Sequence, residues 1–201
     1  MSTNGAQPGQ PDAAGARGRL GAALPGDVVG LGSDGTYTIR TVLVGREIIH
    51  GRITEWRWLF LDDGSLLEWA PKGCVRYRRH RVFEQGSGFY EELVAQDGAL
   101  VRFERRVRAG LAGRRQVRVT IDGRPYRVAF TGTADVRRFG AEPDLPPWRS
   151  LRPDADQNVY FGLLDPADRQ VAILGLWTTD VCLSFGRALD PREITAVHPR
   201  Q

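Results

Sequence analysis

Apolar and polar positions alternate along residues 54–69, a stretch that holds three of the five tryptophans. Alternation with a period of two is typical of a β-strand, whose successive side chains point to opposite faces. Aspartate, glycine and serine at residues 62–65 separate two such runs, and this composition predicts a tight turn. We therefore expect a hairpin at the centre of a β core, with one face formed by Trp56, Trp58 and Phe60 and the other by Glu55, Arg57, Leu59 and Leu61.

Short apolar runs broken by glycine, proline and aspartate continue along most of the chain. Asp122-Gly123 is a strong signal for a two-residue hairpin turn, and Gln96-Asp97-Gly98 is interpreted as a second turn. The predicted fold class is all-β, with two small packed β subdomains built from barrel- or sandwich-like antiparallel sheets and very little helix. Strands are expected at residues 36–44, 74–83, 89–95, 99–108, 117–121, 126–130, 133–139, 159–164, 171–178 and 181–188.

The pattern divides the chain into four regions. Residues 1–24 are rich in small and polar residues and lack periodicity, which predicts a disordered tail. Residues 25–83 are expected to form an N-terminal β subdomain with the tryptophan hairpin. Residues 84–189 form the second subdomain, including a proline-rich crossover at 143–156. Residues 190–201 are expected to be a short helical or irregular tail, because Asp190-Pro191-Arg192-Glu193 begins with an N-cap followed by proline and glutamate.

Charge is unevenly spread along the chain. The 28 basic residues include a single lysine, Lys72, and the formal net charge is +4. Residues 76–138, however, hold 15 arginines against 7 acidic residues, which gives that stretch a net charge of +8. Such asymmetry is typical of a chain that binds an anionic partner.

Cysteine usage and hydropathy indicate the cellular setting. The two cysteines, Cys74 and Cys182, do not form a disulfide framework, and we expect Cys182 to be a buried thiol in a strand. No apolar run approaches the roughly 20 residues of a membrane-spanning helix. No signal-peptide pattern is seen, so the protein is expected to be cytoplasmic.

Residue types that carry catalysis or bind metals are present but scattered. His50, His80 and His198 are far apart in the sequence, and Cys74 has no neighbouring cysteine at metal-ligand spacing. Adjacent carboxylates such as Asp62-Asp63 point to opposite faces of a strand and do not act as an acid–base pair. We therefore expect no metal, no cofactor and no enzymatic activity.

Arginine-rich stretches interleaved with aromatic residues are the main positive signal. On a regular strand Arg76, Arg78 and His80 project to one side, opposite Tyr77 and Arg79. Such a face binds phosphates or an acidic protein. The alternative is a solvated sheet face whose arginines pair with glutamates, and core packing is the alternative for the tryptophans. The candidate partner-binding residues are Trp56, Trp58, Trp69, Arg76, Arg78, Arg79, Arg105, Arg106, Arg114 and Arg115.

Several short motifs occur in the order found in one bacterial family. They are an entry at residues 25–29 (Pro-Gly-Asp-Val-Val), the Glu-aromatic strand at 55–58 that leads through Asp-Gly to Leu-Leu-Glu-Trp at 66–69, an Asp-Gly strand with Tyr126, and Phe-Gly-Ala-Glu-Pro at 139–143 followed by Trp148. Over residues 24–188 the chain resembles domain of unknown function forty-one seventy-eight. The family's aromatic strand usually reads Trp-x-Glu-Tyr, whereas this chain has Glu-Trp-Arg-Trp.

The resemblance implies an all-β bacterial protein with no assigned activity, suggests an envelope-stress or accessory role by association, and supplies no catalytic residues. Together these observations predict a non-catalytic binding or scaffold protein that docks a protein partner. The alternative is binding of nucleic acid or an anionic surface through an arginine-rich sheet face. Peripheral membrane association through a partner is compatible with either function.

Overall fold

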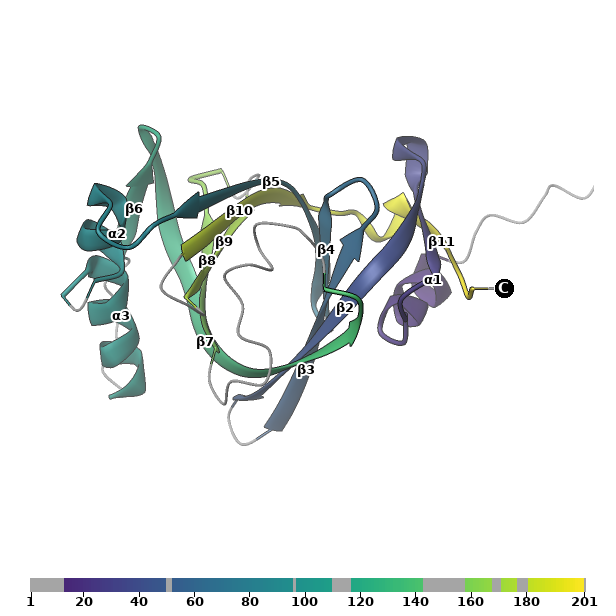
Figure 1. Cartoon of the computed structure of the whole chain (residues 1–201), viewed down its shortest axis with the longest axis horizontal. Helices are drawn as coiled ribbons and strands as arrows, with labels where there is room; N and C mark the ends of the chain where they lie inside the picture. Colours follow the sequence, from purple (N-terminus) through teal and green to yellow (C-terminus); the bar gives the residue numbers. More distant parts are fainter. Residues whose placement is uncertain are drawn as a thin grey trace, which may run out of the picture.

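Antiparallel strands make up most of the structure, a computed structural model that describes residues 13–49, 52–95, 97–109, 117–142, 158–167, 171–176 and 181–200. Within these ranges the chain forms eleven strands and a few short helices (Figure 1). The strands are β1 (Val28–Leu31), β2 (Thr36–Ile49), β3 (Arg52–Leu61), β4 (Leu66–Ala70), β5 (Gly73–Phe83), β6 (Arg118–Ile121), β7 (Arg124–Gly140), β8 (Asn158–Leu164), β9 (Val171–Leu176), β10 (Val181–Ala188) and β11 (Ile194–His198). The helices are α1 (Ala13–Leu20), α2 (Gly88–Leu93), α3 (Ala99–Arg108) and the 3-10 turns η1 (Gly32–Asp34) and η2 (Pro191–Glu193).

All eleven strands belong to one sheet, in the order β11-β1-β2-β3-β4-β5-β10-β9-β8-β7-β6. An additional pairing joins β2 to β7, so the eight strands from β2 to β7 in this order close into a ring (Figure 1). Closure depends on two long strands, β2 and β7, each of which pairs with two successive neighbours along one edge. Strand β2 pairs with β1 and then β7, and β7 pairs with β6 and then β2. The predicted all-β class with little helix is confirmed.

The tryptophan hairpin has the predicted faces. Trp56, Trp58 and Phe60 pack inside the ring with residues of β2, β4, β5, β7 and β8. Leu59 and Leu61, at the alternate positions of the same strand, join a separate cluster outside the ring. The turn at 62–65 contains Gly64 at φ 80°, and the Asp122-Gly123 turn joins β6 to β7 with φ 50° and 74°, as a two-residue hairpin requires.

Aromatic rings inside the ring of strands lie directly over glycines. A Cβ atom added at Gly45 would lie 2.2 Å from the Trp56 indole, and at Gly132 it would lie 2.5 Å from the Tyr160 phenol. The glycines therefore provide space that the large side chains fill. An eight-stranded ring is just wide enough for side chains to fill or for one small ligand. The contacts between aromatic rings and glycines therefore determine how much of the interior the side chains occupy.

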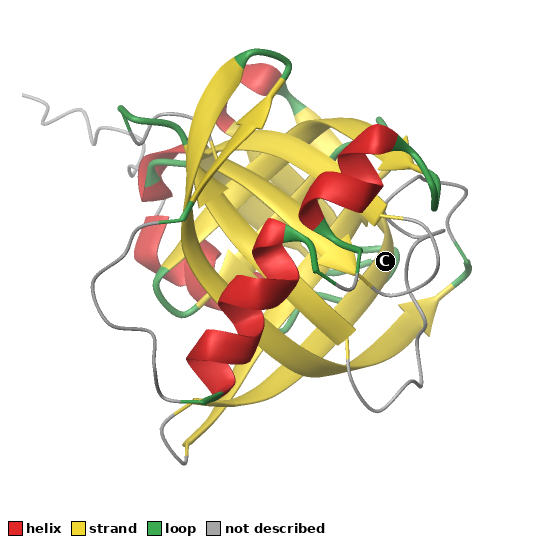
Figure 2. Cartoon of the chain, turned by 90° about the vertical axis from the view of Figure 1, so that its left-hand side faces the viewer, coloured by secondary structure: helices red, strands yellow, loops and turns green. Residues whose placement is uncertain are grey.

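Two apolar clusters cover the outside of the ring at opposite sides. Figures 1 and 2 show α2 and α3 across one side, whereas α1 and β11 lie at the other. On the first side Leu93 and Leu100 pack against β6, β7, β8 and β10. On the second side Ala16 and Leu20 of α1 pack against β1, β2, β3 and β11. Of the helices that the structure describes, none has the length and apolar character needed to span a bilayer.

Two secondary-structure predictions are wrong. The expected hairpin at 89–108 is the helix pair α2–α3, in which Leu100, Phe103 and Val107 recur at helical spacing and Ser87 caps α2. The expected disordered tail is helical from Ala13, and Ala16 and Leu20 of α1 are buried in the outer apolar cluster; just after the helix, the chain at Gly21 passes close to the sheet. A Cβ at Gly21 would lie 2.8 Å from the Trp69 ring. Residues 1–12 lie outside the described part of the chain.

Other boundaries also come out differently. Strands on both sides of residue 83 share one sheet, since β5 pairs with β10 and β2 pairs with β7. The helical start at Asp190 is confirmed by a capping box with Glu193, but residues 194–198 form strand β11. Cys74 and Cys182 are both buried, and no disulfide joins them. The proline-rich crossover at 143–156 lies outside the described residues.

Candidate functional site

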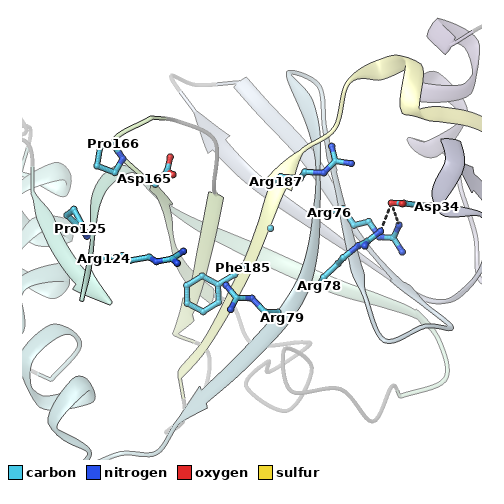
Figure 3. Close-up of a pocket in the computed structure, with 11 residues that line it drawn as sticks. Asp34, Arg76, Arg78, Arg79, Arg124, Pro125, Asp165, Pro166, Phe185 and Arg187 are labelled. Atoms are coloured by element: carbon cyan, nitrogen blue, oxygen red, sulfur yellow. Dashed lines mark hydrogen bonds and ion pairs between the residues drawn. The ribbon is translucent and has the colours of Figure 1, made fainter. Parts of the chain in front are cut away.

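A groove of about 930 Å³ lies on the outer face of the ring, along β5 and β10 and beside the start of β7 (Figure 3). Guanidinium groups dominate its lining: Arg76, Arg78, Arg79, Arg124 and Arg187. Two carboxylates, Asp34 and Asp165, and the ring of Phe185 also line it. We call this feature the arginine groove.

A β-bulge explains why three arginines of β5 reach the same face. Arg79 pairs with Phe185 and Tyr77 pairs with Gly186, so Arg78 is the extra residue between them. A bulge of this kind shifts the alternation by one position. Arg76, Arg78 and Arg79 consequently all line the groove. A Cβ at position 186 would lie 2.1 Å from the Arg76 carbonyl oxygen, so glycine is needed opposite the bulge.

The same bulge corrects the predicted faces of β5. Arg79 stacks over the Phe185 ring at 5.2 Å, on the outer face that alternation assigned to Arg76 and Arg78 but not to Arg79. His80 is turned to the other face, where its Nδ1 lies 2.9 Å from Ser184 Oγ. The prediction that His80 shares a face with Arg76 and Arg78 is therefore wrong.

Arg76 is an internal anchor at the floor of the groove. Its side chain is 2 % exposed, and its guanidinium lies 2.7 Å from Asp63 and 3.1 Å from Asp34. Burial alone would raise the pKa of Asp63, but hydrogen bonds from Ser65 and the charge of Arg76 outweigh it and lower that pKa. The charge of Arg76 is thus satisfied within the protein, which leaves little of it for a ligand.

Two further groove arginines are paired with carboxylates. Arg78 bonds to Asp34, and Arg187 makes a two-pronged contact with Glu193, with one N–O distance of 2.8 Å. Hydrogen bonding from Arg187 lowers the pKa of Glu193 to about 2. These pairs fix the rim of the groove.

Arg79 and Arg124 differ from the other three groove arginines. Both are exposed, and within the described part of the chain neither forms an ion pair with a carboxylate. Burial raises the pKa of Tyr126, and the charges of both arginines oppose this effect, so both lie near its hydroxyl. Figure 3 shows them on either side of Phe185. They are the cations that the groove can offer to a ligand.

The predicted partner-binding residues fall in several places. Trp56 and Trp58 are buried inside the ring, at 4 % and 2 % exposure, so they do not form a docking surface. Trp69 is half-buried against α1. Arg105 and Arg106 are exposed on helix α3, away from the groove lining. Arg114 and Arg115 lie outside the described residues. The groove therefore unites Arg76, Arg78 and Arg79 of the predicted set.

Sequence reasoning missed the other half of the groove. Arg124 follows the turn at 122–123, Asp165 comes directly after β8, and Arg187 lies on the strand that pairs with β5. Each of these residues is separated from β5 by more than 40 positions in the sequence. The Asp-Gly turn before Arg124 was visible, but nothing local indicated which strand would lie beside it.

A serine–histidine contact is the nearest approach to a catalytic arrangement among the described residues. Ser184 is 2 % exposed, and burial lowers the pKa of His80, with the Gly64 backbone opposing that effect. No carboxylate of the described residues orients the imidazole as a catalytic triad would require. In the same ranges no group of three or more His, Cys, Asp and Glu side chains is placed to hold a metal ion.

Comparisons of the chain with protein-family models, curated proteins and solved structures find no match. The resemblance to domain of unknown function forty-one seventy-eight accordingly stays a prediction, and functional inference depends on the geometry.

Proposed function

We propose that the protein is a non-catalytic binding module and that the arginine groove holds an acidic segment of a partner protein. The observation that carries this proposal is the pair of exposed guanidinium groups, Arg79 and Arg124, at the wall of a groove whose other arginines are neutralised. Arg79 is held by stacking on Phe185. Such preorganisation reduces the side-chain entropy lost on binding, because the guanidinium is already ordered.

The mixed character of the groove favours a protein segment over nucleic acid. Asp34 and Asp165 place negative charge in the groove lining, which disfavours a continuous phosphate backbone more than a polypeptide whose acidic groups are spaced apart. Phe185 and the prolines of the lining offer apolar contact that a sugar–phosphate chain does not use. The surface of α3, with Arg102, Arg105 and Arg106 exposed, keeps nucleic acid as the alternative.

Peptide binding to groove variants tests the proposal. The probe is a fluorescein-labelled peptide that alternates glutamate with leucine and proline, measured by fluorescence anisotropy. The groove variant is Arg79→Gln with Arg124→Gln, and the matched control is Arg105→Gln with Arg106→Gln on α3, which removes the same charge elsewhere. Two exposed ion pairs contribute on the order of 1–2 kcal/mol, so the groove variant should bind roughly tenfold more weakly.

Three results would contradict the proposal. The first is an absence of binding to the acidic peptide, and the second is an equal loss in the α3 control. The third is preferential binding of a single-stranded oligonucleotide of the same charge. Binding of the oligonucleotide that decreases steeply with salt would favour the nucleic-acid alternative.

A further inference from the structure

The interior of the ring contains two carboxylates among aromatic side chains, a feature that the arginine groove does not use. Glu47 of β2 accepts a hydrogen bond from the Tyr160 hydroxyl at 2.8 Å, and Glu68 of β4 accepts one from the Tyr77 hydroxyl at 2.6 Å. Trp56 and Trp58 of β3 lie on the strand between β2 and β4. We call these residues the interior cluster: Glu47, Trp56, Trp58, Glu68, Tyr77 and Tyr160.

Within the described part of the chain, neither carboxylate of the interior cluster has a cation beside it. No arginine, lysine or histidine of the described residues forms an ion pair with Glu47 or Glu68. Burial raises the pKa of Glu68 to about 6, opposed by the Tyr77 hydrogen bond and assisted by the charge of Glu47. Burial also raises the pKa of Glu47. A buried carboxylate is normally paired or protonated, so this site favours a positive charge that the described chain does not supply.

The Trp56 indole supplies an independent sign of a missing partner. Trp56 is 4 % exposed, and its Nε1 atom has no hydrogen-bond partner among the described residues. The indole faces Tyr160 edge-on, with ring centroids 5.6 Å apart. Burial raises the pKa of the Tyr160 hydroxyl and its contact with the Trp56 N–H opposes that effect, so the hydroxyl lies near the N–H, although the pair does not reach normal hydrogen-bond geometry. Buried N–H groups nearly always have an acceptor. Among the described residues, the Trp56 N–H therefore has no well-placed acceptor and the two carboxylates have no cation.

Solvent reaches this part of the interior. Glu68 and the neighbouring Ala70 and Val75 are only half-buried, although Ala70 and Val75 pack against the apolar residues inside the ring. Trp58, in contrast, is 2 % exposed and forms a closed wall beside Glu68, with which it is paired. Water can therefore reach the Glu68 carboxylate, and the buried Trp58 ring closes the site on its inner side.

We propose that the interior cluster binds a small organic ammonium ion that carries a neutral oxygen atom, such as an amino alcohol. The ammonium group would lie between Glu47 and Glu68 and against the faces of the aromatic rings, which attract cations. The oxygen would accept the Trp56 N–H. A metal ion fits less well, because the described residues bring no third metal-ligating side chain to the two carboxylates.

Three probes of four non-hydrogen atoms each separate these requirements: ethanolamine, propylamine and propan-1-ol. Binding is followed at pH 7.5 through the NMR signal of the Trp56 indole N–H, assigned with a Trp56→Phe variant. Ethanolamine should shift this signal at the lowest concentration. Propylamine lacks the oxygen and should bind several-fold more weakly, and propan-1-ol lacks the charge and should bind at least tenfold more weakly.

Carboxylate variants complete the test. Glu47→Gln and Glu68→Gln should each weaken ethanolamine binding about tenfold, whereas Glu55→Gln, on the outer face of the same hairpin, should leave it unchanged. Circular dichroism confirms that each variant is folded. Equal binding of propan-1-ol and ethanolamine, equal loss in the Glu55 control, or an unshifted indole signal in saturating ethanolamine would overturn the proposal. An unshifted signal would mean that protons and water satisfy the interior cluster.

Discussion

Replacing Glu68 by glutamine changes how the stability of the protein depends on pH. The substitution keeps the shape of the side chain and an oxygen that can accept from the Tyr77 hydroxyl, which lies 2.6 Å from the Glu68 carboxylate. It removes only the ability to ionise. Any difference in pH dependence between the two proteins therefore reports the titration of this carboxyl group together with its coupling to Glu47.

The sign of the effect follows from the raised pKa of Glu68, which is about 6 in the folded protein against an ordinary value of 4.5. Because the folded state binds this proton more tightly than the unfolded state, the stabilising contribution is complete below pH 4.5 and is lost as the pH rises through 6. A shift of that size corresponds to about 2 kcal/mol. Since the residue is only half-buried, this value is an upper limit.

Urea unfolding monitored by tryptophan fluorescence from pH 4 to pH 8 measures the effect. Relative to Glu68→Gln, the wild-type protein should lose up to about 2 kcal/mol of unfolding free energy over this range. Other titrating groups, such as Asp63 and Glu193, are common to both proteins and cancel in the difference. A difference that stays constant across the range, or that increases with pH in favour of the wild type, would refute the assignment of a buried, destabilised carboxylate.

Two further predictions concern the groove floor and the ring interior. Arg76→Ala removes the buried cation of Asp34 and Asp63. Because both carboxylates are 34 % exposed, the loss in urea unfolding should be about 2–3 kcal/mol, below that of a fully buried pair; the exposed pair removed by Arg81→Ala should cost less than about 1 kcal/mol. Gly45→Ala places a methyl group 2.2 Å from the Trp56 ring and should cost about 1–3 kcal/mol, whereas Gly73→Ala meets no atom within 4 Å and serves as the control. Equal losses in variant and control would contradict either prediction.

The alternation of apolar and polar residues was sufficient to assign side chains to the two faces of a strand when those faces differ in polarity. On β3 the alternation of apolar residues assigned Trp56, Trp58 and Phe60 to one side, and the structure places them together inside the ring. Ring closure was beyond such reasoning, because Thr41–Arg46 of β2 pair with residues 135–140 of β7, which are nearly 100 positions away. Helix α3 was a different failure. Its helical spacing was present, but the arginines between the apolar residues also fit an alternating strand.

The site depends on one irregularity that alternation does not reveal. The bulge at Arg78 moves Arg79 to the outer face and His80 to the inner face. Whether a strand bulges depends on its neighbour, here Gly186 of β10, where a side chain would collide with the backbone of β5. Pairing of β5 with β10 is a tertiary contact, so a correct list of arginines from the sequence still gave the wrong face for one of them.

Arg76 and Glu68 show how the closed sheet separates charge. They lie on neighbouring strands, but the buried Arg76 faces outward and meets two aspartates, whereas the half-buried Glu68 faces inward and meets no cation among the described residues. The protein has 28 basic residues, but none of the described ones lies beside the Glu68 carboxylate. If an ammonium ion supplies that charge, it binds best when Glu68 is ionised. Ethanolamine should then stabilise the wild-type protein more at pH 7.5 than at pH 4.5, and Glu68→Gln should reduce this pH dependence of the stabilisation, leaving the part that Glu47 contributes.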